Sequence, residues 1–319
     1  MTTLPLSLPP DDLTDDALTD RVRVLQRRNG HRYSVDDVAT AWLALRAMPG
    51  ARSSLDLGCG IGSVLLMIAD RLQKVRAVGV EAQAGSYALA ERNVEKNQLG
   101  RRVSVQYGDL RDPALLDRIL QAQAAFGHEG GFDLVTGTPP YKPLGTASLS
   151  PDSQRAHARV ELRGGVEAYL AAAARVLAPE GVFVMCAQNE QAERVASGAC
   201  AVNLLPIHRV DVIPMRERKG RLFSVYAFVH ATRSDAGAAI IEQLRAQPLV
   251  AAEPGASEVL VLRDEHGART PEACALRAFF GLISDPSEPA SPPKRLDDRR
   301  VASATSPNAS NRSAQENVG

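Results

Sequence analysis

The sequence lacks paired cysteines, long apolar runs and a net charge, and each absence narrows what the chain can be. Its four cysteines show no C-x-x-C spacing, which predicts reduced thiols rather than a zinc site or a disulfide framework: Cys59, Cys186, Cys200 and Cys274. No run approaches the ~18 apolar residues that a membrane helix requires. Basic and acidic residues both number 37, so the formal net charge of zero argues against a chain that coats nucleic acid through its overall charge.

The overall composition predicts a soluble globular protein of one large or two modest domains. Of the 319 residues, 45% are hydrophobic and 23% are charged, which suffices for a core of ordinary size. The N-terminal stretch MTTLPLSLPPDDLTDD has neither a basic nor an apolar segment, so it is not expected to be a secretory signal. We therefore expect a cytoplasmic protein, and we favour a monomer.

Short β-rich runs alternate with helical patterns between residues 54 and 230. Strands are predicted at residues 54–58, 76–81, 103–109, 132–137, 181–187, 207–214 and 222–230, and helices at residues 62–72, 86–99, 112–126 and 166–177. Strands joined by helices of this length form parallel βαβ units, so the predicted fold class is α/β, with a doubly wound, mostly parallel sheet of seven strands. The last two strands are joined by MRERKGR, which predicts an antiparallel hairpin at the edge of the sheet.

Smaller elements are predicted on both sides of this core. Residues 22–47 predict a turn and a helix, with Ser34 as N-cap and with Asp36 and Asp37 complementing the positive end of the helix dipole. Helices at residues 236–248 and 270–283 flank a short strand at residues 258–264, and from residue 284 the scarcity of large apolar side chains predicts disorder. The expected organisation is an N-terminal segment and helix (1–47), a core domain (48–232), a small α/β extension (233–283) and a tail (284–319).

A glycine-rich turn, LDLGCGIG, joins the first core strand to its helix. Gly58, Gly60 and Gly62 let the backbone approach a ligand where a Cβ would intrude. The spacing is G-x-G-x-G rather than the G-x-G-x-x-G of dinucleotide-binding folds, which disfavours a nicotinamide oxidoreductase. Glu81 ends the second strand and Asp109 ends the third, where carboxylates can accept hydrogen bonds from ribose hydroxyls and from an exocyclic adenine amine.

With Asp56 before the glycines, this ordered set resembles the motifs of the class I S-adenosylmethionine-dependent methyltransferases, over roughly residues 50–230. The resemblance implies a Rossmann-like methyltransferase fold, with S-adenosyl-L-methionine as cofactor and no metal. It also implies that the glycine loop cradles the amino-acid end of the cofactor, while Glu81 holds the ribose and Asp109 lies beside the adenine.

The segment Thr138-Pro139-Pro140-Tyr141 follows the fourth core strand. It resembles the [Asn/Asp/Ser]-Pro-Pro-[Tyr/Phe] loop of methyltransferases that modify planar amino groups, such as adenine N6 or a glutamine amide, and the resemblance implies that all four residues are catalytic. The first side chain and the first proline's carbonyl would hold the N–H groups of the acceptor, and the tyrosine ring would stack on it. Thr138 departs from the family pattern, because the threonine side chain is β-branched and shorter than that of asparagine. The alternative is a stiff Pro-Pro turn whose tyrosine simply packs.

The N-terminal stretch RRNGHRYSVDDVATAWLA is similar to a segment of the bacterial tRNA adenine-N6 methyltransferases that act beside the anticodon of a valine tRNA. The residues that match that family are Gly30, Arg32, Ser34 and Asp36, together with Arg159 and Glu161 after the Pro-Pro-Tyr loop. The family's stretch covers the methionine end of the cofactor. The full set of cofactor-binding residues implied by the resemblance is Arg32, Ser34, Asp56, Gly58, Cys59, Gly60, Gly62, Glu81, Asp109, Leu110 and Thr138.

An RNA substrate requires phosphate contacts from local basic patches. The candidates are Lys142, Arg155, Arg159, Arg163, Arg216, Arg218, Lys219 and Arg221, although each cluster is equally compatible with a solvated face. His31 and His157 receive no catalytic role. The leading hypothesis is methyl transfer to adenine N6 in tRNA or another structured RNA. The alternatives are transfer to a protein glutamine amide or a small-molecule amine, and a non-catalytic protein that binds S-adenosylmethionine or RNA.

Overall fold

The structure is a computed structural model that describes residues 12–146, 150–216, 220–246 and 258–283. All of them belong to one compact unit, Met1–Glu288. The tail expected from residue 284 lies outside the described residues, as does most of the stretch tested for a signal sequence. None of the helices in the described ranges is long and apolar enough to cross a bilayer.

The predicted alternation of strands and helices is confirmed. Its first half consists of β3 (Ser53–Leu57), α2 (Ser63–Arg71), β4 (Arg76–Glu81), α3 (Ala84–Lys96), β5 (Val103–Tyr107), α4 (Pro113–Ala124) and β6 (Phe132–Gly137). The second half consists of α5 (Ser153–Arg159), α6 (Val166–Val176), β7 (Leu177–Ala187), the 3-10 helix η2 (Asn189–Gln191), α7 (Ala192–Ala201), β8 (Leu204–Ile213) and β9 (Phe223–His230). The short helix α5 and the helix α7 were not predicted.

The fold is α/β with a mostly parallel sheet, as expected, but within the described residues the sheet has eight strands rather than seven, in the order β10-β8-β9-β7-β6-β3-β4-β5. The extra strand β10 (Glu258–Val261) pairs in parallel with β8 and covers its edge. The hairpin of β8 and β9 therefore does not end the sheet, and the antiparallel strand β9 lies inside it, between β7 and β8. Covering an edge removes a row of unpaired backbone donors and acceptors, which explains the addition.

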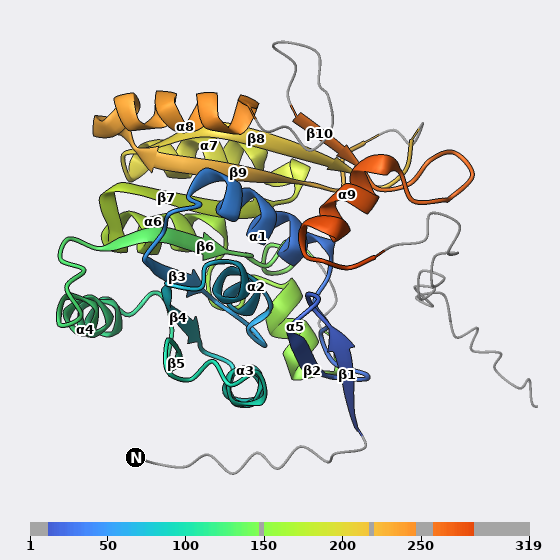
Figure 1. The fold of residues 1–319 in the computed structure, drawn as a ribbon, viewed down its shortest axis with the longest axis horizontal. Helices are drawn as coiled ribbons and strands as arrows, with labels where there is room; N and C mark the ends of the chain where they lie inside the picture. Colours follow the sequence, from blue (N-terminus) through green and yellow to red (C-terminus); the bar gives the residue numbers. More distant parts are fainter. Residues whose placement is uncertain (1–11, 147–149, 217–219, 247–257, 284–319) are drawn as a thin grey trace, which may run out of the picture. The chain divides into compact units, whose positions relative to one another are not determined.

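Helices cover both faces of the sheet (Figure 1). One face packs against α1 (Val35–Ala47), α2, α3 and α8 (Ser234–Ala246), and the other against α4, α6 and α7. The side chains from Val182 to Ala187 in β7 are all buried, which is typical of a strand with helices on both sides. With both faces covered, the carboxyl ends of the parallel strands are the place where a ligand can reach the core.

The N-terminal segment adds elements around α1. Ser34 is the N-cap of α1, as predicted, and its N–H donates to Asp37 Oδ2 at 2.9 Å. Two strands that the sequence did not predict, β1 (Leu13–Ala17) and β2 (Arg23–Arg27), form an antiparallel hairpin. The helix α9 (Pro271–Phe279) packs on α1 and β10.

Candidate active site

A cavity lies beyond the carboxyl ends of β3, β4, β5 and β6, where doubly wound folds bind their ligands. Eight of the predicted catalytic and cofactor-binding residues line it: Gly58, Cys59, Gly60, Glu81, Asp109, Leu110, Thr138 and Pro140. The structure thus brings the glycine loop, two acidic strand ends and part of the Pro-Pro-Tyr loop to one cavity. The residues Arg32, Ser34, Asp56, Gly62, Pro139 and Tyr141 do not line it.

The glycine loop requires the residues that it has. Gly58 and Gly60 have φ angles of +63° and +57°, a region that disfavours residues with a Cβ. A Cβ at Gly58 would also overlap the hydroxyl of Tyr169, and a Cβ at Gly137 would lie 2.6 Å from the ring of Tyr169. Tyr169 comes from α6 and forms part of the cavity wall. Sequence reasoning missed it, because no local pattern marks where this helix packs.

Glu81 is hydrogen-bonded to the backbone of the glycine loop. Its Oε2 accepts a hydrogen bond from the N–H of Gly60 at 2.9 Å, and its Oε1 accepts one from the N–H of Gln83 at 2.6 Å. Burial raises the pKa of Glu81 to about 7 despite these bonds, so the free site holds a carboxyl group that is partly protonated at neutral pH. Hydroxyl donors brought by a ligand would stabilise its charged form.

Asp56 lies beneath the loop rather than in the cavity. Its Oδ2 accepts from the N–H of Leu65 at 3.2 Å in the first turn of α2, and its Oδ1 accepts from the Thr136 hydroxyl at 2.8 Å. The side chain is 3% exposed, and burial raises the pKa of Asp56 to about 7. Asp56 therefore joins β3, α2 and β6 just below the glycine loop.

Asp109 faces the cavity with a partner already in place. Arg111 forms a bidentate ion pair with it, with N–O distances of 2.9 Å from Nε and 2.7 Å from Nη2. This guanidinium holds the pKa of Asp109 below its usual value, so the carboxylate is charged at neutral pH. An adenine amine could use the lone pairs that Arg111 leaves open.

In the Pro-Pro-Tyr loop, Thr138 and Pro140 face the cavity while Tyr141 anchors the loop. The Thr138 hydroxyl has no hydrogen-bond partner within the described part of the chain, so it is available to a ligand. The Tyr141 hydroxyl donates to Asp36 Oδ2 at 2.8 Å and lies 3.2 Å from Cys186 Sγ, and its ring stacks on Phe223 at 6.5 Å between centroids. In this structure the ring thus contacts the core and the N-terminal segment, whereas the family resemblance places it against the acceptor.

The same loop is tied to the segment after α5. The N–H of Lys142 donates to the carbonyl of Arg159 at 2.9 Å, and the N–H of Glu161 donates to the carbonyl of Lys142 at 2.9 Å. Glu161 is held in turn by Arg194, with N–O distances of 2.8 and 3.0 Å, and by Gln191. The two matched residues Arg159 and Glu161 therefore contact the loop through their backbone.

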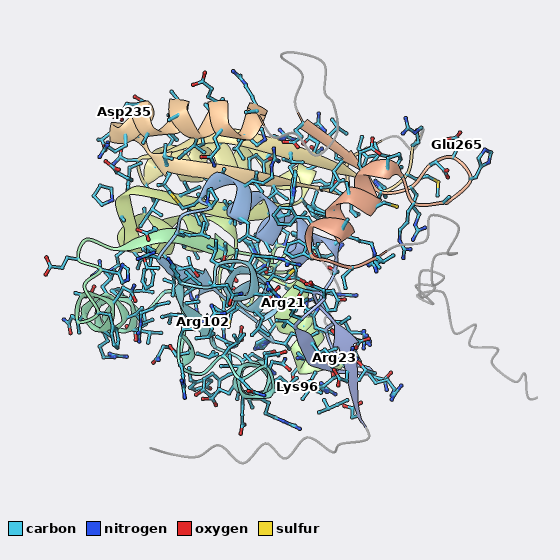
Figure 2. The ribbon with its side chains drawn as sticks, in the orientation of Figure 1. Arg21, Arg23, Lys96, Arg102, Asp235 and Glu265 are labelled. Atoms are coloured by element: carbon cyan, nitrogen blue, oxygen red, sulfur yellow. The ribbon has the colours of Figure 1, made fainter. Side chains whose placement is uncertain are left out.

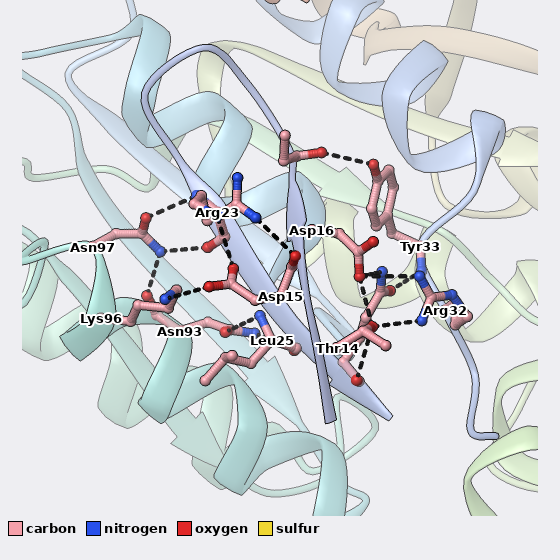
Figure 3. A network of polar contacts seen from close by, with 12 residues as sticks. Thr14, Asp15, Asp16, Arg23, Leu25, Arg32, Tyr33, Asn93, Lys96 and Asn97 are labelled. Atoms are coloured by element: carbon pink, nitrogen blue, oxygen red, sulfur yellow. Dashed lines mark hydrogen bonds and ion pairs between the residues drawn. The ribbon is translucent and has the colours of Figure 1, made fainter. Parts of the chain in front are cut away.

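The N-terminal segment contributes different residues from those predicted. The guanidinium of Arg32 bonds to Asp16 at 3.0 Å and to Thr14 at 2.7 Å in the network around the β1–β2 hairpin (Figure 3). Its neighbours His31 and Tyr33 line the cavity instead, because successive side chains of an extended segment point to opposite sides. Asp37 lines it as well, and burial raises the pKa of its carboxyl group.

The segment from α5 to residue 164 forms another wall, and of its lining residues sequence reasoning assigned a role only to Arg163, as a candidate phosphate contact. Gln154 accepts from the N–H of His31 at 3.1 Å and donates to the Ser86 hydroxyl at 3.2 Å. Burial, with the nearby charge of Arg163, lowers the pKa of His157, whose Nδ1 has no partner in the part of the chain that the structure describes. Arg163 also lines the cavity and forms no ion pair with the described residues.

The other predicted basic residues have different surroundings. Arg155 donates to the carbonyl of Gly30 at 3.2 Å, so it supports the N-terminal segment. In the hairpin, Arg221 pairs with Asp211 at 2.9 Å, which compensates its charge. Arg218 and Lys219 lie outside the described residues.

Comparison with known families assigns the chemistry that the cavity's residues suggest. Residues 55–135, which run from the glycine loop to β6, match the family model described as a methyltransferase domain. The chain therefore contains a methyltransferase domain, and its cofactor is S-adenosyl-L-methionine.

Similar proteins act on two kinds of acceptor. The chain is 27% identical to the tRNA1(Val) (adenine(37)-N6)-methyltransferase of Yersinia pestis (strain Pestoides F) over 73% of this chain and 80% of that protein. It is 27% identical to the enzyme of the same name from Porphyromonas gingivalis over 53% of this chain and 63% of that one. It is also 35% identical to the release factor glutamine methyltransferase of Geobacter sulfurreducens over 38% of each chain. The matches span less than two thirds of the Geobacter and Porphyromonas proteins.

Proposed function

We propose that the protein transfers the methyl group of S-adenosylmethionine to adenine N6 in structured RNA, with tRNA as the foremost substrate. The observation that carries the proposal is that Thr138 and Pro140 line the same cavity as Gly58 and Glu81. The loop that resembles an acceptor loop for planar amines thus adjoins the glycine loop. The relatives named for tRNA adenine methylation, which match over most of this chain, support the choice of acceptor.

In this proposal the residues at the ends of β3, β4 and β5 would hold the cofactor. Glu81 would accept hydrogen bonds from the ribose hydroxyls, and Asp109 would accept one from the adenine amine. The backbone of Gly58 and Gly60 allows the methionine end to approach closely. Asp37, on the opposite wall, pairs with the cofactor's ammonium group, which would reverse the burial-driven rise of its pKa.

Methyl transfer then needs orientation more than acid–base chemistry. The amine nitrogen attacks the methyl carbon as the carbon–sulfur bond breaks, which leaves S-adenosylhomocysteine, and the surplus N–H proton passes to solvent. The Thr138 hydroxyl, which faces the cavity, accepts from one amine N–H group. The family resemblance gives the second acceptor role to the carbonyl of Pro139, which does not line the cavity in this structure, and the two bonds together aim the lone pair at the methyl group. Holding both reactants in line supplies most of the rate enhancement.

Arg163 in the cavity wall and Lys142 outside the cavity are placed to meet phosphate groups beside the target nucleotide. Arg163 has no described ion-pair partner, and Lys142 is exposed immediately after the Pro-Pro-Tyr loop. A tRNA substrate would make the protein cytoplasmic, in line with the expectation from the sequence.

A protein glutamine amide is the second candidate acceptor. It is favoured by the 35% identity to a release factor glutamine methyltransferase over 123 residues. Chemically, the amide is also a planar amine that two acceptors can hold, so the same loop would serve either substrate.

The test is transfer of radiolabelled methyl from S-adenosylmethionine into fractionated cell extract, with Thr138→Val as the variant. The matched control is Thr146→Val, which removes a hydroxyl that bonds to the carbonyl of Pro143 further along the segment. We expect label in the small-RNA fraction, recovered as N6-methyladenosine, with Thr138→Val slow and Thr146→Val normal. Label in protein would replace RNA with the glutamine acceptor, and normal transfer by Thr138→Val would refute the role given to its hydroxyl.

A further inference from the structure

A second cleft, with a volume of about 250 Å³, lies between α4 and the starts of β4 and β5. It is at the opposite end of these strands from the candidate active site, since Arg76 begins β4 here and Glu81 ends it there. Four arginines line the cleft, and no aspartate or glutamate is among its described lining residues. The side chains that matter for its chemistry are Arg76, Arg101, Arg102, Arg118, Gln123 and Phe126.

The four arginines have no carboxylate in direct contact among the described residues. None of them forms an ion pair within the described ranges, although other arginines nearby do, such as Arg111 with Asp109 and Arg175 with Asp117. Arg102 is half-buried, donates to the carbonyl of Leu72 at 3.2 Å, and has its pKa lowered by burial. A concentration of like charges in a chain with zero net charge disfavours the empty cleft and favours an anion in it.

Gln123 provides an independent indication of a ligand. It lies on α4 with 3% of its surface exposed, and its Nε2 has no hydrogen-bond partner among the residues that the structure describes. A buried donor left unpaired costs about 1–3 kcal/mol. Because Gln123 lines the cleft, an acceptor oxygen bound there can satisfy this donor, as it can the guanidinium groups.

Phe126 narrows the chemistry of the ligand. The ring is 56% exposed at the end of α4, and the guanidinium carbon of Arg76 lies 3.5 Å from its centroid. A guanidinium stacked in this way keeps its N–H edge free for phosphate, and an exposed ring beside it offers a surface on which a base can stack. Phosphates next to unpaired bases occur in the loops of structured RNA.

We propose that this cleft is a second RNA-binding site, which holds backbone phosphates of the substrate. It lies at the ends of the strands opposite to those where methyl transfer is proposed. The inference rests on the RNA substrate proposed above. Five residue steps along β4 separate Arg76 from Glu81, or about 17 Å, so one folded RNA can reach both ends of the strand. In Figure 2, the label of Arg102 marks the region of the cleft, and Asp235 at the start of α8 lies toward the opposite edge of the sheet.

The experiment measures the affinity for unfractionated bacterial tRNA at several salt concentrations. The variants are Arg101→Gln and Arg118→Gln, two exposed arginines at the cleft, and the control is Arg245→Gln, an exposed arginine on α8. Each phosphate contact contributes about 0.7–0.9 to the slope of log affinity against log salt concentration. We expect each cleft variant to reduce the slope by about that amount and Arg245→Gln to leave it unchanged. Unchanged affinity for 5′-methylthioadenosine verifies that each variant is folded.

The outcomes separate this inference from the proposed function. If the wild-type protein binds tRNA and the cleft variants keep its slope, the inference is overturned while the RNA substrate stands. If the wild-type protein does not bind tRNA, the proposed substrate fails and the inference fails with it. The cleft variants are also titrated with 5′-adenosine monophosphate and inorganic phosphate. Loss of that binding with an unchanged tRNA slope would assign the cleft to a free nucleotide or phosphate and overturn the RNA proposal.

Discussion

Glu81 should make the affinity for the cofactor depend on pH. Burial raises the pKa of its carboxyl group from an ordinary 4.5 to about 7 in the free protein. Ribose hydroxyls that donate to the carboxylate stabilise only its charged form, so binding must lower this pKa. Affinity then rises with pH up to about 7, where the free carboxyl group is already ionised, and is constant above that value.

The size of the effect follows from the two pKa values. If binding restores the ordinary value of 4.5, the fraction of free protein in the binding-competent charged form falls about elevenfold at pH 6 and hardly at all at pH 8. The dissociation constant should therefore be about tenfold larger at pH 6 than at pH 8, equivalent to about 1.4 kcal/mol. Binding at pH 6 should also release close to one proton.

Calorimetric titration with 5′-methylthioadenosine tests this prediction, because the ligand keeps the ribose and adenine but lacks the titratable amino-acid group. Measuring the heat in two buffers with different ionisation enthalpies gives the number of protons released. Glu81→Gln is the control, since it should bind more weakly and show no dependence on pH. The reasoning is refuted if the wild-type affinity changes less than twofold between pH 6 and pH 8, or if Glu81→Gln retains the dependence.

Three further predictions concern stability and the acceptor loop. Burial raises the pKa of Asp56 to about 7, so the folded protein keeps a proton that the unfolded chain has released above its ordinary pKa of 3.8. The free energy of unfolding should therefore fall as pH rises from about 4 to 7. Asp56→Asn should flatten that fall in denaturant titrations. Tyr141→Phe removes the bond to Asp36 but keeps the ring, so we expect about 1 kcal/mol lower stability, reduced kcat and an unchanged cofactor affinity; full activity would contradict the anchoring role. Gln123→Leu removes a buried donor without a described partner, so thermal unfolding should show a more stable protein. Titration with tRNA should show weaker binding by the same variant. A loss of stability would mean that the donor is satisfied in the free protein.

The sequence predicted the features that depend on local pattern. The alternation of strands and helices, the turn at Gly58 and Gly60, and the N-cap at Ser34 follow from periodicity and from backbone conformations that few residues adopt. The position of Glu81 was predictable because the sequence shows where its strand ends, and doubly wound sheets generally bind ligands at such strand ends. These features explain why the cavity could be expected at the ends of β3 and β4.

The remaining features depend on tertiary packing. Tyr169 and Gln154 reach the cavity from α6 and α5, and no pattern near either residue states where its helix will pack. The orientation of Arg32 away from the cavity follows from its bonds to Asp16 and Thr14 in a hairpin whose polar strands carry no clear β signal. The pairing of β10 with β8 joins segments 48 residues apart at their first pair, Glu258 with Val210, and could not be read from either segment alone.

The bonds between the acceptor loop and the α5 segment also bear on the order of events in turnover. The backbone of Lys142 is hydrogen-bonded to Arg159 and to Glu161. Gln154 and His157, which belong to the α5 segment, form a wall of the cofactor cavity. A displacement of that wall large enough to exchange spent cofactor for fresh would pull the loop with it and release whatever acceptor the loop holds. If cofactor exchange in the proposed reaction takes this route, the methylated product leaves no later than S-adenosylhomocysteine, and an RNA with two target adenines would be modified in two separate visits.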